Sequence, residues 1–420
     1  MNQHRVFKIS TIVRSKKSLW KDVFCLILLL MYTSPTLAVQ TETLPETIST
    51  ASVRYGQISG LEQRFTEDNS LVRLTDYKSI EFDAETLARF NPEAATLIET
   101  LNRFGLYNAG DLFNLGTLEF ETTPTIQYMA PLYARGLTKN WTLAVGIPIV
   151  NYKNDVNIQQ SFSNIAYYDQ FRGLDPALDA ALDTDLGAAT QNTLIQKGYK
   201  PIVDRDESFV ADLQMVSIWK FYEGATNKSL HQLTLNLPTG PKYDTDDLLA
   251  LNAFGKTYIE NSVAFSQTVN TYLSLNPYTN FRYYLPEKLE IRVPENDSDV
   301  LPDESSKENL TKYEGYQYEI GGQANLAIND DLNFGVDYRI GQKVQDSFSK
   351  ADRGNSQVLA TNTDSNWHKV GFEMSYSTVK SYLSKKSLIP MNLSFLAYDT
   401  ISGKNVERRI GQELSIALFF

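Results

Sequence analysis

The chain has 420 residues, of which 39 are basic and 50 acidic, so its net charge is −11. This acidity argues against a nucleic-acid partner, because nucleic-acid phosphates require basic patches. After residue 38, no apolar run approaches the roughly 20 residues of a helical membrane span. Composition and length alone therefore suggest a secreted soluble protein, and only the residue pattern indicates anything else.

The N-terminus has the pattern of a secretory signal peptide over residues 1–38. Basic residues between Arg5 and Lys21 precede the short apolar run Val23–Met31, and Thr36–Ala38 is a suitable cleavage site. An uncleaved membrane anchor is the alternative. The only cysteine, Cys25, lies inside the signal, so the mature chain is expected to have no disulfide bond.

Residues 39–115 form a polar segment that is predicted to be partly helical. Within residues 83–104, apolar side chains such as Leu87, Leu97 and Leu101 recur at helical spacing. Three interpretations stay open for this segment: a plug inside the domain that follows, a small periplasmic extension, or disorder.

Residues 116–420 alternate apolar and polar side chains in short runs, which is the period of a β-strand. Eleven strands are expected after residue 124: 126–137, 141–152, 209–222, 229–237, 258–269, 272–284, 316–328, 332–340, 367–382, 388–400 and 406–420. Bacterial membrane barrels have an even strand count. A twelfth strand is therefore expected at Leu115–Thr122 or Ser52–Ile58, and 12–14 strands is the predicted range.

The hairpin 316–340 gives the clearest evidence for an antiparallel transmembrane β-barrel. One face of each strand is apolar and uncharged, whereas the other carries charges, amides and glycines. Lipid outside and a polar lumen inside require this arrangement. We therefore expect Val336→Arg to destabilise the protein strongly and Asp337→Ala to be tolerated.

The connections alternate between short turns at one rim and longer loops at the other, which are 153–207, 238–257, 285–314 and 343–366. The first of these loops contains a predicted helix, 176–196, that either folds inward as a constriction or projects outward. The acidic stretch 294–312 reads as a solvated loop, with divalent-cation binding as the alternative.

Strand parity also predicts which side chains line the lumen. The charged candidates for the lumen lining are Asp212, Glu260, Arg282, Glu319, Asp337, Arg339, Lys369, Glu373, Arg409 and Glu413. The apolar lumen candidates are Tyr278, Tyr284, Trp367 and Tyr398. The charges either pair to join neighbouring strands or line a permeation path. Aromatic side chains indicate either a filled lumen or the passage of apolar solutes.

Catalytic patterns are absent from the sequence. The chain has no G-x-S-x-G elbow, no pair of histidines at metal-binding spacing, and no phosphate-binding or dinucleotide-binding loop. We therefore predict no enzyme activity, no catalytic residue, no metal site and no cofactor.

Short motifs resemble the Gram-negative outer-membrane transporters for hydrophobic compounds, of the FadL and TodX type, which include the meta-pathway phenol-degradation barrels. Tyr133–Val150 is similar to a strand–turn–strand of that family that ends in proline, and Leu235–Lys242 is similar to its LPTG strand end. Asn91 and Pro92 resemble part of the hatch motif, interrupted by Glu93, and mark the plug candidates. Leu414–Phe420 resembles the C-terminal signal for barrel assembly, with Phe420 as its last residue.

The resemblance implies a monomeric barrel in the outer membrane that takes up small hydrophobic or aromatic compounds. Its expected partners are outer-membrane lipid, lipopolysaccharide, the barrel-assembly machinery and a small hydrophobic solute. A general diffusion porin, or a barrel that displays its long acidic loops, are the alternatives.

Overall fold

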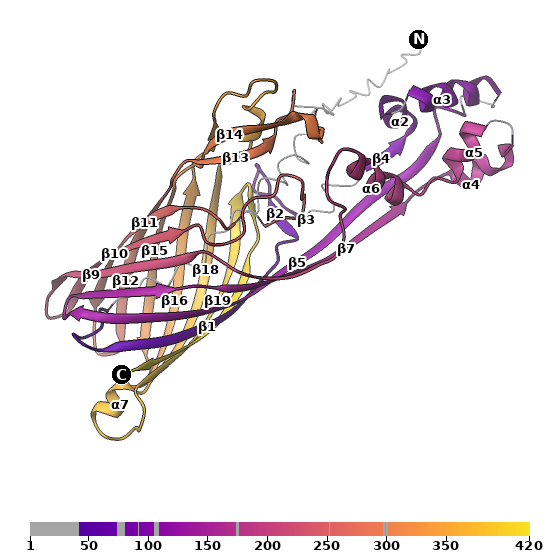
Figure 1. The fold of residues 1–420 in the computed structure, drawn as a ribbon. Helices are drawn as coiled ribbons and strands as arrows, with labels where there is room; N and C mark the ends of the chain where they lie inside the picture. Colours follow the sequence, from indigo (N-terminus) through magenta and orange to yellow (C-terminus); the bar gives the residue numbers. More distant parts are fainter. Residues whose placement is uncertain are drawn as a thin grey trace, which may run out of the picture.

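The computed structural model describes residues 42–73, 80–90, 92–104, 109–173, 176–251, 253–296, 299 and 301–420. The predicted signal peptide lies outside these ranges. Within them, twelve antiparallel strands close into one barrel (Figure 1). In order around the ring they are β1(Ser49–Ser59), β21(Ile410–Phe419), β19(Met391–Lys404), β18(Ser365–Ser377), β16(Leu332–Lys343), β15(Gln317–Ala327), β12(Leu273–Tyr284), β11(Tyr258–Thr268), β10(Asn227–Leu237), β9(Leu213–Glu223), β6(Trp141–Gly146) and β5(Asn114–Thr138).

Strand β1 closes the barrel. Tyr55 pairs with Leu414 of β21 on one side and with Met129 of β5 on the other. The twelfth strand is thus the one expected at 52–58, whereas the other candidate, 115–122, is the first half of the long strand β5. Placing the start of the barrel at residue 116 was therefore wrong, because one wall strand lies in the preceding segment.

The outer face of the barrel is an apolar surface. Along the barrel strands, every second residue points outward, and many of these are large hydrophobic side chains. Val336, for example, is 48% exposed, whereas its neighbour Asp337 is only 7% exposed. This contrast between adjacent residues is the one that a lipid exterior and a packed interior produce. None of the helices in the described ranges is long and apolar enough to cross a membrane.

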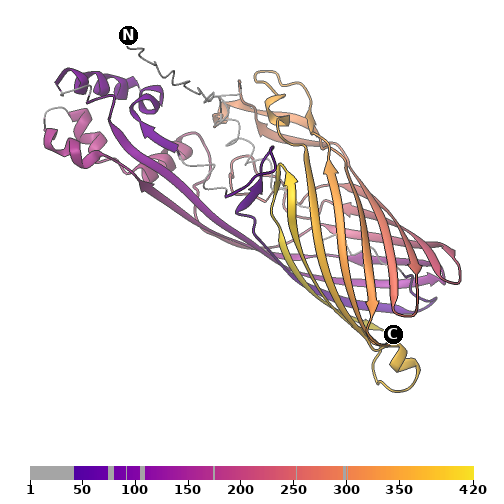
Figure 2. The ribbon, with the colours of Figure 1, turned by 180° about the vertical axis from the view of Figure 1, so that it is seen from behind.

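The two rims of the barrel differ in the length of their connections. Four short turns, the helix α7(Val379–Leu383) and the C-terminal end of β21 lie at one rim, and the long connections lie at the other (Figures 1 and 2). Short turns are periplasmic in bacterial barrels and long loops are external. This assigns the α7 rim to the periplasm.

An arm extends from the external rim, away from the barrel (Figures 1 and 2). Its stem is the first half of β5 paired with β7(Ile149–Ser161), which in turn pairs with β8(Arg205–Val210). The arm also contains β4(Ile80–Asp83), α2(Ala84–Phe90), α3(Pro92–Phe104), α4(Ile165–Tyr168), the 3-10 helix η1(Asp169–Phe171), α5(Pro176–Leu182) and α6(Leu186–Gln196). The helix expected over 176–196 is therefore two helices, and Asp185 caps the second by accepting from the Ala188 amide at 3.0 Å.

The arm has its own apolar core, and this core explains why its helices do not enter the lumen. Leu97 and Leu101 of α3 pack with Phe113, which directly precedes β5, with Leu118 of β5 and with Tyr168 of α4. The apolar face of α3, which a plug would have packed against the barrel interior, is thus buried within the arm. The described helices of 39–115, α2 and α3, therefore lie in the arm.

Two small sheets cover parts of the external mouth. One contains β13(Glu287–Arg292), β14(Lys307–Tyr313) and β17(Ser347–Phe348), with the 3-10 helices η2(Glu304–Ser306) and η3(Val358–Ala360) nearby in sequence. The other contains β2(Gln63–Phe65), β3(Leu71–Arg73) and β20(Val406–Glu407). Phe65 packs there against the lumen-facing Trp367. The acidic stretch 294–312 is thus partly ordered secondary structure rather than a simple solvated loop.

Candidate functional site

The inner wall of the barrel is the candidate site, and strand parity placed most of its side chains. The side chains of Glu260, Arg282, Glu319, Asp337, Lys369, Arg409 and Glu413, together with Tyr284 and Trp367, are each at most 9% exposed. Arg339, Glu373, Tyr278 and Tyr398 lie on the same face and are half-buried. The structure therefore brings these predicted residues together on the inner face of the wall.

Four aromatic side chains of the inner wall lie over glycines. Each aromatic residue is directly opposite a glycine of the adjacent strand: Tyr128 and Gly56, Tyr278 and Gly321, Trp367 and Gly341, Tyr398 and Gly411. A Cβ atom on any of these glycines would come within 2.4 Å of the facing ring. The glycines are needed for close approach, so the rings lie along the wall.

Three of these rings reach an acid one strand beyond their glycine. The Tyr128 hydroxyl donates to Glu413 at 2.6 Å, and the Tyr278 hydroxyl donates to Asp337 at 2.9 Å. The Trp367 indole N–H donates to Glu319 at 2.9 Å. Buried aromatic polar groups require such partners. The same arrangement, in which an aromatic ring crosses a glycine and donates a hydrogen bond to an acid on the next strand, thus occurs three times around the wall.

Arginines neutralise further acids on the inner face. Arg282 donates from Nε to Glu260 at 2.7 Å, and its guanidinium lies 4.4 Å from the ring centroid of Tyr258. Arg339 donates from Nε to Asp337 at 2.8 Å. Buried ion pairs of this kind are costly to break, because the remaining charge stays buried.

The sequence missed one charged group of the inner wall, Arg54, and gave no hydrogen-bond partner for another, Glu373. Arg54 was not among the predicted residues, because β1 was only one of two candidates for the last strand. Its Nη1 lies 3.9 Å from Glu413. Glu373 accepts from Gln323 at 2.7 Å across β16.

Asp212 has a different position from the one predicted. It lies at the junction between β8 and β9 rather than on a regular strand, and its Oδ1 accepts from the amides of Gly240 and Gly255 at 2.8 and 3.0 Å. Asn236 also donates to it at 2.8 Å. Asp212 therefore fixes the 238–256 loop to the wall and is not a lumen-lining charge. The LPTG motif takes part, because Thr239 donates to the Ala211 carbonyl.

The 238–256 loop adds an apolar surface to the external half of the interior. Phe254 packs there with Phe209, their ring centroids 5.1 Å apart. The same cluster contains Ile58, Leu61, Ile126, Tyr128, Val150, Tyr152, Ala211 and Ala253. One side of the interior near the external rim is thus apolar and partly covered.

The segment Glu42–Thr47, which we name the N-terminal strap, packs against the inner wall at the periplasmic end. The Leu44 amide donates to Thr142, which is fully buried, at 2.8 Å. A Cβ atom on Gly136 would meet the Pro45 carbonyl oxygen. Glu42 pairs with Lys228 of β10. The strap therefore touches both the β5–β6 wall and β10.

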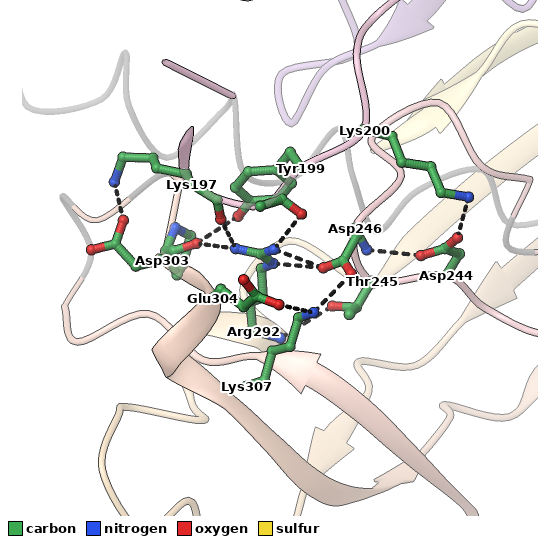
Figure 3. Close-up of polar contacts among 12 residues, drawn as sticks. Lys197, Tyr199, Lys200, Asp244, Thr245, Asp246, Arg292, Asp303, Glu304 and Lys307 are labelled. Atoms are coloured by element: carbon green, nitrogen blue, oxygen red, sulfur yellow. Dashed lines mark hydrogen bonds and ion pairs between the residues drawn. The ribbon is translucent and has the colours of Figure 1, made fainter. Parts of the chain in front are cut away.

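A network centred on Arg292 joins the external loops (Figure 3). Its guanidinium donates to Asp246 at 2.7 Å, to the Lys197 carbonyl at 2.7 Å and to the Pro302 carbonyl at 3.0 Å. It also lies 3.9 Å from the ring centroid of Tyr199. One buried side chain thus joins three loop segments, around residues 197–199, Asp246 and Pro302.

Electrostatics in this network favour the ionised forms of Asp246 and of its partner Lys307. Burial opposes ionisation of Asp246, but hydrogen bonds from Lys307 and Arg292 outweigh it and lower the pKa of Asp246. The same Asp246 contact raises the pKa of Lys307. Burial raises the pKa of the Tyr199 hydroxyl. The network therefore stays charged and closed at neutral pH.

The remaining predicted residues are Asn91, Pro92 and Phe420. Pro92 begins α3 in the arm, and Asn91 lies outside the described residues. Phe420 is 67% exposed, and its backbone exchanges two hydrogen bonds with Ser49 at 2.8 and 3.0 Å. Its recognition by the assembly machinery stays a prediction.

No family model and no curated protein matches the sequence. Among solved structures, the chain is similar to the COG4313 outer membrane channel from Pseudomonas putida F1, with a TM-score of 0.52 and 10% identity, over 91% of this chain and 99% of that one. The Pseudomonas putida toluene transporter TodX matches with a TM-score of 0.31 and 9% identity, over 92% and 94%. At these identities the first similarity concerns the fold alone.

Three features define the class of protein: the closed ring of strands, the apolar outer face, and the two rims with short and long connections. The protein is a 12-stranded antiparallel transmembrane β-barrel of the outer membrane.

Proposed function

We propose that the protein is an outer-membrane channel for the uptake of small hydrophobic or aromatic compounds. The observation that carries this proposal is the inner wall itself. It combines flat aromatic rings, such as Tyr278 and Trp367, with acids that are already hydrogen-bonded or ion-paired. A pore for hydrated ions needs unpaired charge along its path, whereas apolar solutes are favoured by aromatic surface.

A plug was one of three interpretations of residues 39–115, and this proposal gives the narrowing role to the N-terminal strap alone. Its contacts with Thr142, Gly136 and Lys228 place it across part of the periplasmic end. In this proposal the strap narrows the exit, and the Arg292 network keeps the external loops together at the entrance. Outer-membrane lipid and lipopolysaccharide surround the barrel, which acts as a monomer.

Liposome swelling tests the proposal with two solutes of different size, methyl glucoside and phenyl glucoside. A channel with an aromatic path is expected to admit phenyl glucoside faster although it is the larger solute. Liposomes without protein, and liposomes with the same protein unfolded before reconstitution, are the controls. A general porin would admit the smaller methyl glucoside faster, and that result would contradict the proposal.

A further inference from the structure

One row of the inner wall is unusually basic. Reading across neighbouring strands, Arg339 of β16 is opposite Lys369 of β18, and Lys369 is opposite Thr400 of β19. The Thr400 amide donates to the carbonyl of Arg409, which lies just before β21, at 3.0 Å. Adjacent strands are about 4.8 Å apart. Three cations and a hydroxyl thus follow one another along the wall.

The two arginines of this row have acidic partners. Arg339 donates to Asp337 at 2.8 Å, and Arg409 lies 3.4 Å from Glu407. Lys369 differs, because its ammonium makes no hydrogen bond or ion pair with any described residue, although the side chain is only 6% exposed. Thr400 is fully buried, and its hydroxyl also has no partner within the described ranges.

This arrangement is unfavourable for a charged Lys369 ammonium, and either loss of its proton or binding of an anion would relieve it. A buried charge without a partner costs several kcal/mol, and like charges directly opposite on adjacent strands repel each other. Glu319 attracts Lys369, but Arg409, Arg339 and Arg282 all repel it. The Glu319 carboxylate is also occupied, since it accepts from the Trp367 indole and from Asn280.

The surroundings of Lys369 indicate what kind of anion fits. Its ammonium lies 5.3 Å from the ring centroid of Trp367, and Tyr398 lies one row away on β19. Tyr398 is opposite glycines on both sides, Gly371 and Gly411. Aromatic surface therefore borders the cations. The nearby Glu319 disfavours a ligand with more than one negative charge.

We propose that Lys369 and Thr400 bind the carboxylate of a small aromatic acid inside the barrel, an inference that rests on the proposed uptake function. The ammonium and the hydroxyl both donate to the carboxylate, and the ring of the ligand lies against Trp367 and Tyr398. The site thereby selects aromatic monocarboxylates among the apolar solutes.

Calorimetric titration of benzoate into the refolded full-length protein tests this site. Wild type is expected to bind benzoate saturably, and Lys369→Met to bind it about tenfold more weakly or worse, because a charge-assisted hydrogen bond is lost. Lys369→Arg should retain binding. Lys220→Met is the matched control, since Lys220 is a wall lysine of β9 that is already paired with Glu223 at 2.8 Å. Benzyl alcohol, which lacks the carboxylate, should not distinguish Lys369→Met from wild type.

Urea unfolding gives a second readout that does not depend on ligand binding by the variant. Without ligand, Lys369→Met should be at least as stable as wild type, and benzoate should stabilise only wild type. Equal benzoate affinity in Lys369→Met and wild type would overturn the inference, as would wild type binding benzoate no better than benzyl alcohol. If phenyl glucoside enters liposomes but benzoate does not bind, this inference fails and the channel proposal stands. If benzoate binds but neither glucoside enters, the channel proposal fails instead.

Discussion

Replacing Val336 by arginine should prevent the barrel from folding stably. Val336 is on the lipid face of β16 and is 48% exposed. An arginine at the bilayer midplane of a membrane barrel costs about 2–4 kcal/mol, because its charge enters hydrocarbon. The measurement is reversible urea unfolding of the purified protein in lipid vesicles, followed by tryptophan fluorescence.

The matched control for this prediction is Ile328→Arg. Ile328 belongs to the same hairpin and is 53% exposed, but it lies beside the periplasmic turn, where its amide donates to the Leu332 carbonyl. Arginine near the interface costs only about 0–1 kcal/mol. Equal losses of stability in the two variants would show that Val336 does not face lipid and would refute the register.

Asp337→Ala is also expected to destabilise the protein, by about 3–5 kcal/mol. The sequence alone suggested that this change would be tolerated, because Asp337 belongs to the polar face of its strand, which is expected to face the lumen. In the structure Asp337 accepts from both Arg339 and Tyr278. Its removal leaves the arginine buried without that partner and the Tyr278 hydroxyl without an acceptor. The same urea assay measures the loss.

The double variant Asp337→Ala, Arg339→Met distinguishes pairing from packing. If the loss in Asp337→Ala arises from the uncompensated arginine, removing that charge should restore much of the stability. A double variant that is less stable than Asp337→Ala by the full cost of a second independent change would contradict the pairing.

Much of the barrel could be predicted from the sequence because a barrel wall has a strict period of two. Once residues such as Val336 are assigned to lipid, the neighbours Asp337 and Arg339 must point inward. The same parity placed Trp367 and Lys369. It did not place Arg54, because β2, β3, β4, α2 and α3 separate β1 from β5, the next barrel strand along the chain.

The rest depended on contacts that no local pattern encodes. The helical period of α3 showed an apolar face, but not that Phe113 and Tyr168 would cover it. Asp212 has the parity of a lumen residue, yet a break between two strands turns it toward the amides of Gly240 and Gly255. The pairing of rings with glycines, such as Tyr128 with Gly56, follows only from the register between strands.

Planar-bilayer conductance tests the central claim, that the interior is a solute path narrowed by the N-terminal strap. The comparison is between the mature protein and a variant that lacks only residues 42–47, because a longer deletion would remove β1 and open the barrel wall. We predict small or rare openings in the mature protein and larger, steadier openings in the deletion variant. Two forms that both stay silent while correctly folded would contradict a path through this barrel.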